Sequence, residues 1–159
     1  MFNKLLVTFF GIGNIKFAPG TIASFISLIL LLILNYYITK PTFILIFIFL
    51  LIISFLFVKE YILELKTKDS QEIVIDEVLG IYLILILIKI DYEMVIPSFI
   101  IIILLFRFFD IAKIFPMNLI EKKYDNAFGI IADDLIAGLY TVVLYLILQY
   151  LLHFTLEIT

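Results

Sequence analysis

The feature that most constrains this chain is a set of three long stretches without a charged side chain. They cover residues 17–39, 41–58 and 135–156. A helix needs roughly 20 apolar residues to cross the hydrocarbon core of a bilayer, and each stretch is about that long. In lipid, a helix satisfies its own backbone hydrogen bonds, which favours it over open strands. We therefore expect an all-α, polytopic membrane protein.

Two further apolar stretches, residues 73–90 and 94–110, carry charged residues near their ends. We expect them to form a helical hairpin that turns at Asp91-Tyr92-Glu93, which gives about five spans in a single domain over residues 1–159. The composition agrees, because 65% of the residues are hydrophobic and 16% are charged, against about 45–50% and about 25% in soluble domains. The charged loop that follows residue 58 is expected to begin as a solvated helical extension.

The basic residues separate unevenly when five spans alternate across a membrane. Lys40 and Lys89 fall on one side. The other side receives Lys4, Lys16, Lys59, Lys66, Lys68, Arg107, Lys113, Lys122 and Lys123. Because basic residues prefer the cytoplasmic side, the sequence predicts a cytoplasmic N-terminus. The net charge of −3 gives no support to nucleic-acid binding, which needs a basic surface.

The same topology gathers five carboxylates on the predicted cytoplasmic side. They are Asp76, Glu77, Asp110, Asp133 and Asp134. Ionisable groups inside a membrane are costly unless they are paired, metal-bound or hydrated, so their clustering predicts a site. The sequence has no Cys, and oxygen ligands alone suit Mg²⁺ better than Zn²⁺. Because protein-bound Mg²⁺ often contacts substrate phosphates, we expect phosphate chemistry on a lipid headgroup.

Two other polar groups complete the predicted site. Arg107, Asp110 and Lys113 follow i, i+3, i+6 spacing, which on a continuing helix gives one polar face whose cations could neutralise phosphate oxygens. The Pro19-Gly20-Thr21 turn, with Ser24, could offer backbone N–H groups and hydroxyls to a headgroup.

Two glycines, Gly80 and Gly138, lie one turn after a carboxylate and would allow close approach of a neighbouring helix or a headgroup.

Simpler interpretations stand beside these. An Asp76-Glu77 pair at a helix start is typical of a partner for the helix dipole, and Asp133-Asp134 could cap the last span. Arg107 and Asp110 could form a structural ion pair. Functionally, a small transporter or ion-conducting protein could use the same carboxylates, and so could a non-catalytic lipid-binding subunit. A transporter needs polar groups near the bilayer midplane, whereas these are expected near one face.

Four motifs in order resemble the phosphatidylglycerophosphatase A family over about residues 9–145. They are Ala18-Pro19-Gly20-Thr21 with Ser24, Ile75-Asp76-Glu77-Val78-Leu79-Gly80, Phe106-Arg107-Phe108-Phe109-Asp110-Ile111-Ala112-Lys113, and Gly129-Ile130-Ile131-Ala132-Asp133-Asp134-Leu135-Ile136-Ala137-Gly138. The resemblance implies a Mg²⁺-dependent phosphatase of the bacterial cytoplasmic (inner) membrane, with its active site facing the cytoplasm. It also implies the substrate, phosphatidylglycerophosphate, which would lose its terminal phosphate.

The residues and the resemblance together predict a role for each site residue. Asp76, Glu77, Asp133 and Asp134 are the expected Mg²⁺ ligands, whether direct or through water. Arg107, Asp110 and Lys113 are the expected catalytic residues, with Asp110 either a further ligand or the general base. Pro19, Gly20, Thr21, Ser24 and Lys113 are the expected substrate contacts.

Overall fold

A computed structural model describes residues 2–65, 71–90, 95–124 and 126–158. Within these ranges the regular structure is entirely helical, which confirms the all-α expectation. The elements are α1 (Phe2–Val7), a 3₁₀ turn η1 (Ile12–Asn14), α2 (Pro19–Tyr37), α3 (Lys40–Leu65), α4 (Ile75–Leu87), α5 (Val95–Ala112), α6 (Met117–Lys123) and α7 (Ala127–Ile158). The predicted turn at residues 91–93 lies outside the described residues.

Among the described residues, four helices are long and apolar enough to cross a membrane: α2, α3, α5 and α7. They correspond to four of the five predicted stretches. α3 continues to Leu65, so the expected helical extension beyond residue 58 is present. The count of five spans and the cytoplasmic N-terminus stay predictions.

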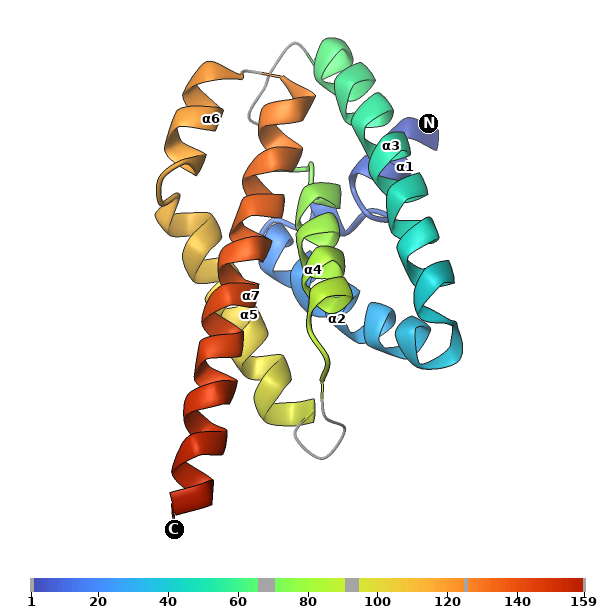
Figure 1. Ribbon diagram of the computed structural model, residues 1–159. Coiled ribbons are helices and arrows are strands. Elements are labelled where there is room, and N and C mark those ends of the chain that lie inside the picture. Colours follow the sequence, from blue (N-terminus) through green and yellow to red (C-terminus); the bar gives the residue numbers. More distant parts are fainter. Residues whose placement is uncertain (1, 66–70, 91–94, 125, 159) are drawn as a thin grey trace.

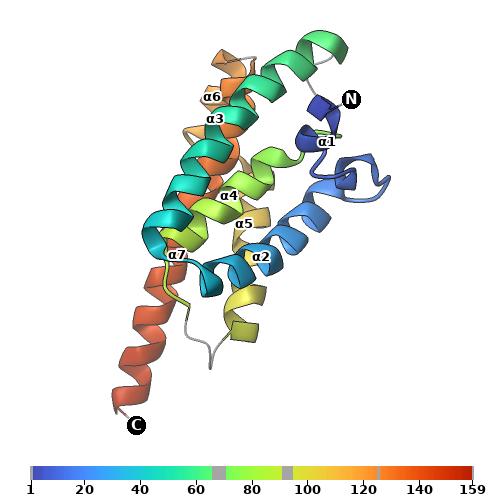
Figure 2. The ribbon, with the colours of Figure 1, turned by 90° about the vertical axis from the view of Figure 1, so that its right-hand side faces the viewer.

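The remaining predicted span, residues 73–90, contains a shorter helix than expected. α4 has 13 residues, which is about 20 Å at 1.5 Å per residue, against a hydrocarbon core about 30 Å thick. It lies in the middle of the bundle (Figures 1 and 2) and packs against α7, α2 and α3. Nine of its residues are buried, so its apolar sequence reflects burial inside the protein.

Two glycines bring α4 and α7 together. A Cβ atom added to Gly80 would lie 2.8 Å from the backbone carbonyl oxygen of Asp134 and 2.6 Å from the ring of Phe106. A Cβ atom on Gly138 would lie 2.9 Å from the carbonyl oxygen of Gly80. Close approach of the kind that small residues permit between membrane helices therefore sets the distance between these two helices.

The helix ends differ from the sequence expectations in two places. The Asn126 side-chain oxygen accepts hydrogen bonds from the N–H groups of Phe128 at 3.0 Å and Gly129 at 3.3 Å, so Asn126 caps α7. The alternative that Asp133-Asp134 caps the last span is therefore wrong, because both residues lie well inside α7. The polar face expected on a continuing helix is also wrong in its last member, since α5 ends at Ala112 and Lys113 is left-handed with φ 42°.

Candidate active site

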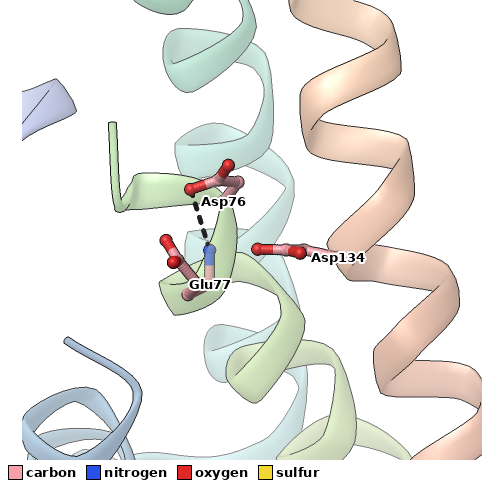
Figure 3. A group of neighbouring side chains, drawn as sticks. All are labelled: Asp76, Glu77 and Asp134. Atoms are coloured by element: carbon pink, nitrogen blue, oxygen red, sulfur yellow. Dashed lines mark hydrogen bonds between the residues drawn. The ribbon is translucent and has the colours of Figure 1, made fainter. Parts of the chain in front are cut away.

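Three carboxylates from two helices meet where α4 begins (Figure 3). Asp76 and Glu77 stand in the first turn of α4, and Asp134 projects from α7 toward them. One oxygen from each of the three lies within 4.8 Å of the others. Asp76 and Asp134 are only 9% and 5% exposed. The close packing of α4 on α7 therefore brings together three of the four predicted metal ligands.

Nearby protein groups do not fully stabilise this carboxylate cluster, defined as Asp76, Glu77 and Asp134. Asp76 accepts a hydrogen bond from the Glu77 backbone N–H at 3.1 Å. The Oε2 atom of Glu77 is buried and has no hydrogen-bond partner among the described residues. Buried negative charges this close repel one another unless a cation or protons intervene. Three oxygen ligands with an unsatisfied acceptor fit a hard divalent cation such as Mg²⁺.

Asp133 lies apart from the carboxylate cluster. Successive residues on an α-helix point about 100° apart, so Asp133 cannot share the direction of Asp134. Its Oδ2 lies 3.3 Å from the Lys113 Nζ, although Lys113 follows the end of α5. The structure thus places this predicted metal ligand beside a predicted catalytic cation.

Arg107 lies next to the cluster. Its Nη1 is 2.7 Å from Asp110 Oδ2 and 3.7 Å from Glu77 Oε1. Arg107, near the end of α5, therefore lies beside Glu77 at the start of α4. Its Nε is buried and lacks a hydrogen-bond partner within the described ranges. Because a buried donor without a partner is costly, this nitrogen is available to an anionic ligand.

The charges of this region are unbalanced. Asp110 also acts electrostatically on Glu77 and Asp134, so five ionisable acids share the region with two cations, Arg107 and Lys113. The excess is three negative charges if all the acids are ionised. One divalent cation would reduce this excess to one negative charge. A phosphate bound without a metal ion would instead increase it.

The start of α2 packs against the carboxylate cluster at Gly20. α2 begins at Pro19, whose fixed φ suits the first helical position, and the preceding Ala18 is left-handed with φ 44°. Gly20 is buried, and a Cβ atom there would overlap the Oε1 of Glu77 and lie 3.2 Å from Arg107 Nη1. Among the predicted substrate contacts, Gly20 therefore has a defined steric role, because any larger residue would displace Glu77.

The hydroxyls of α2 are less accessible than expected. Ser24 is fully buried, and its Oγ donates a hydrogen bond of 2.8 Å to the carbonyl oxygen of Gly20 in the same helix. Its predicted contact with a headgroup therefore lacks a free proton donor. Thr21 is partly exposed in the first turn of α2.

Comparison with known proteins agrees with this geometry. The model of the family "Phosphatidylglycerophosphatase A" matches residues 5–149. The chain belongs to the phosphatidylglycerophosphatase A family. It is a phosphatase of lipid metabolism with several apolar helices of membrane-spanning length.

Two relatives extend over nearly the whole of this family member. A protein of Haemophilus influenzae named phosphatidylglycerophosphatase A is 32% identical over 92% of this chain and 88% of its own length. A protein of Bacteroides thetaiotaomicron named putative phosphatidylinositol-3-phosphatase is 28% identical over 93% of this chain and 94% of its own length. No solved structure matches the chain.

Proposed function

We propose that this protein removes the terminal phosphate of phosphatidylglycerophosphate in a Mg²⁺-dependent reaction, giving phosphatidylglycerol and inorganic phosphate. The observation that carries the proposal is the buried meeting of Asp76, Glu77 and Asp134 beside Arg107 in a member of this family. The reaction takes place at the cytoplasmic leaflet of the bacterial inner membrane, where the headgroup reaches the site and the acyl chains stay among lipids.

In this proposal Asp76, Glu77 and Asp134 hold the cation. Their oxygens lie within 4.8 Å of one another, and the unsatisfied Oε2 of Glu77 supports this role. Bound Mg²⁺ supplies an activated water and offsets negative charge on the phosphate. Asp133 contributes by orienting Lys113, from which it is 3.3 Å away.

Arg107 and Lys113 bind the phosphate oxygens. The buried, unpartnered Nε of Arg107 supports this role, and the 2.7 Å contact with Asp110 holds the guanidinium in place. A water oxygen bonds to phosphorus while the bond between phosphorus and the glycerol oxygen breaks. Asp110 takes the proton that the water loses, the leaving glycerol oxygen takes a proton from solvent water, and the two cations stabilise the charge of the transition state.

The position of the charges supports hydrolysis over transport. After Glu77, α4 has no charged residue, so its carboxylates gather in its first turn instead of following its length. A headgroup at a membrane surface needs charges at such a boundary, whereas a transported ion needs them through the span.

The test compares two adjacent acids of α7 in purified protein in detergent, with phosphatidylglycerophosphate as substrate and phosphate release as the measurement. We expect release to require Mg²⁺ and to stop with a chelator. Asp134→Asn should raise the Mg²⁺ concentration for half-maximal rate by about 100-fold or more. Asp133→Asn, the matched control, should leave that concentration unchanged and raise KM.

Two results would refute the assignments. Phosphate release that survives the chelator excludes the metal role, and an equal Mg²⁺ requirement in wild type and Asp134→Asn excludes the carboxylate cluster as the metal site. The name of the Bacteroides relative suggests a competing substrate. Phosphatidylinositol 3-phosphate belongs in the same assay, and a kcat/KM higher for it than for phosphatidylglycerophosphate would overturn the substrate assignment.

A further inference from the structure

The segment that leads into α4 is fixed by residues far from it in sequence. Glu72, four residues before Asp76, accepts a hydrogen bond from the Tyr61 hydroxyl at 2.5 Å. The same carboxylate oxygen lies 3.0 Å from the Lys4 Nζ. Tyr61 belongs to α3 and is 3% exposed, whereas Lys4 belongs to α1. One carboxylate thus connects the N-terminal helix, the end of α3 and the segment before α4.

The backbone of this segment is held as well. The Val74 N–H donates a hydrogen bond of 3.1 Å to the carbonyl oxygen of Val7. Gly13 packs so closely on Glu72 that an added Cβ atom would overlap the Glu72 carbonyl oxygen. Val7 and Val74 are 0% and 1% exposed. Both the side chain and the main chain before Ile75 are therefore anchored to the N-terminal part of the protein.

We propose that Glu72 is a positioning residue for the metal site and that Tyr61 and Lys4 hold it in place. The inference rests on the proposed metal role of Asp76 and Glu77, which begin one turn after Glu72. α4 contacts α7 through Gly80 and Gly138, and its first turn meets α2 at Gly20. The contacts of Glu72 fix the segment from which this turn begins.

Glu72 matters for the metal site because such a site tolerates only small displacements of its ligands. Ligands must be held within about 0.5 Å of their productive positions, and residues that orient ligands indirectly change metal affinity by about 10–100-fold when removed. Asp76 and Glu77 stand where α4 starts, and helix ends fray unless they are anchored. The contacts of Glu72 supply that anchor from outside the helix.

The experiment uses the full-length protein in detergent and titrates Mn²⁺ as the metal probe, followed by its paramagnetic resonance signal. Tyr61→Phe removes the hydroxyl donor, and Glu72→Ala removes the acceptor. Tyr145→Phe is the matched control, because its hydroxyl also donates to a buried partner, Ser98 Oγ at 2.8 Å, between α7 and α5. Hydrogen exchange of residues 73–80 and 129–138 is measured on the same samples without metal.

We expect Tyr61→Phe and Glu72→Ala to weaken Mn²⁺ binding by about tenfold, while Tyr145→Phe binds Mn²⁺ as wild type does. Exchange should accelerate over residues 73–80 and stay unchanged over 129–138. Unchanged exchange in both site variants would overturn the anchoring, and accelerated exchange with unchanged Mn²⁺ affinity would overturn its link to the metal. If wild type binds no Mn²⁺, the proposed metal role fails, and the exchange result still decides whether Glu72 fixes α4.

Discussion

Gly80→Ala should damage both packing and metal binding, because Gly80 lies where α4 touches the backbone of α7. The added Cβ atom would stand 2.8 Å from the Asp134 carbonyl oxygen, whereas ordinary contacts begin at 3.4 Å. The helices must therefore separate by about 0.6 Å, or Phe106 and α7 must rearrange together.

The size of each effect follows from this displacement. Overpacking costs about 1–3 kcal/mol, and replacing glycine by alanine within a helix returns about 0.5–1 kcal/mol, so the net loss of stability is about 0–2.5 kcal/mol. Because ligands must be held within about 0.5 Å of their productive positions, a displacement of about 0.6 Å should raise the Mg²⁺ requirement about tenfold.

The assay measures phosphate release against Mg²⁺ concentration and, separately, the thermal unfolding midpoint. Leu31→Ala is the control, since it removes a buried side chain of α2 and costs about 2–5 kcal/mol without widening the contact between α4 and α7. It should lower the midpoint and leave the Mg²⁺ requirement unchanged. A Gly80→Ala protein with the wild-type Mg²⁺ requirement would refute the reasoning, whatever its stability.

Three further predictions concern residues outside the carboxylate cluster. Hydrogen bonding from Tyr61, and then from Lys4, lowers the pKa of Glu72 below its usual 4.5. The ionised carboxylate therefore stabilises the fold above about pH 4.5, and this contribution is lost as the pH falls through the lowered pKa. Glu72→Gln should be less stable than wild type at pH 7 by about 0.2–1 kcal/mol, and the thermal unfolding midpoints of the two proteins should converge on acidification. Convergence toward alkaline pH would contradict this. Lys113→Met should raise KM for the lipid about 10–100-fold, the value of a charge-assisted hydrogen bond, at an unchanged Mg²⁺ requirement; unchanged KM would remove this residue from phosphate binding. Asn126→Ala should destabilise the protein by about 1 kcal/mol through the lost cap, measured by thermal unfolding, and equal midpoints would show that the cap contributes nothing.

The sequence predicted the long, largely exposed apolar helices better than the short helix enclosed by other helices. A high hydropathy indicates that a segment is shielded from water, either by lipid or by protein. Within residues 73–90, α4 is shielded mainly by the helices that pack against it. The sequence therefore could not distinguish a spanning helix from the 13-residue α4. For α2 and α3, which are long and apolar enough to cross a membrane, the limits of the uncharged stretches came within a few residues of the helix ends, except where α3 continues as a charged extension.

The sequence predicted which charged residues gather at the candidate site, but not which of them contact each other. Scarcity of charge in an apolar chain identified Asp76, Glu77, Arg107 and Asp134 as neighbours, because one topology brings them to one side. The direction of Asp133 depends on the rotation of α7, which the sequence does not specify. The sequence did not indicate the contacts of Glu72, because its partners Tyr61 and Lys4 come from distant segments. In the sequence, Glu72 is one of several charged residues in a loop that was expected to be solvated.

The shortness of α4 has a consequence for how this helix responds to the thickness of the bilayer. A spanning helix tilts when the thickness of the bilayer changes, but the 13 residues of α4 are too few to cross the hydrocarbon core. The Lys40 Nζ donates a hydrogen bond of 3.1 Å to the Leu85 carbonyl oxygen near the end of α4, so this end is completed by protein. The first turn of α4, which carries Asp76 and Glu77, is therefore positioned by the helices packed around it and not by a match between its own length and the bilayer.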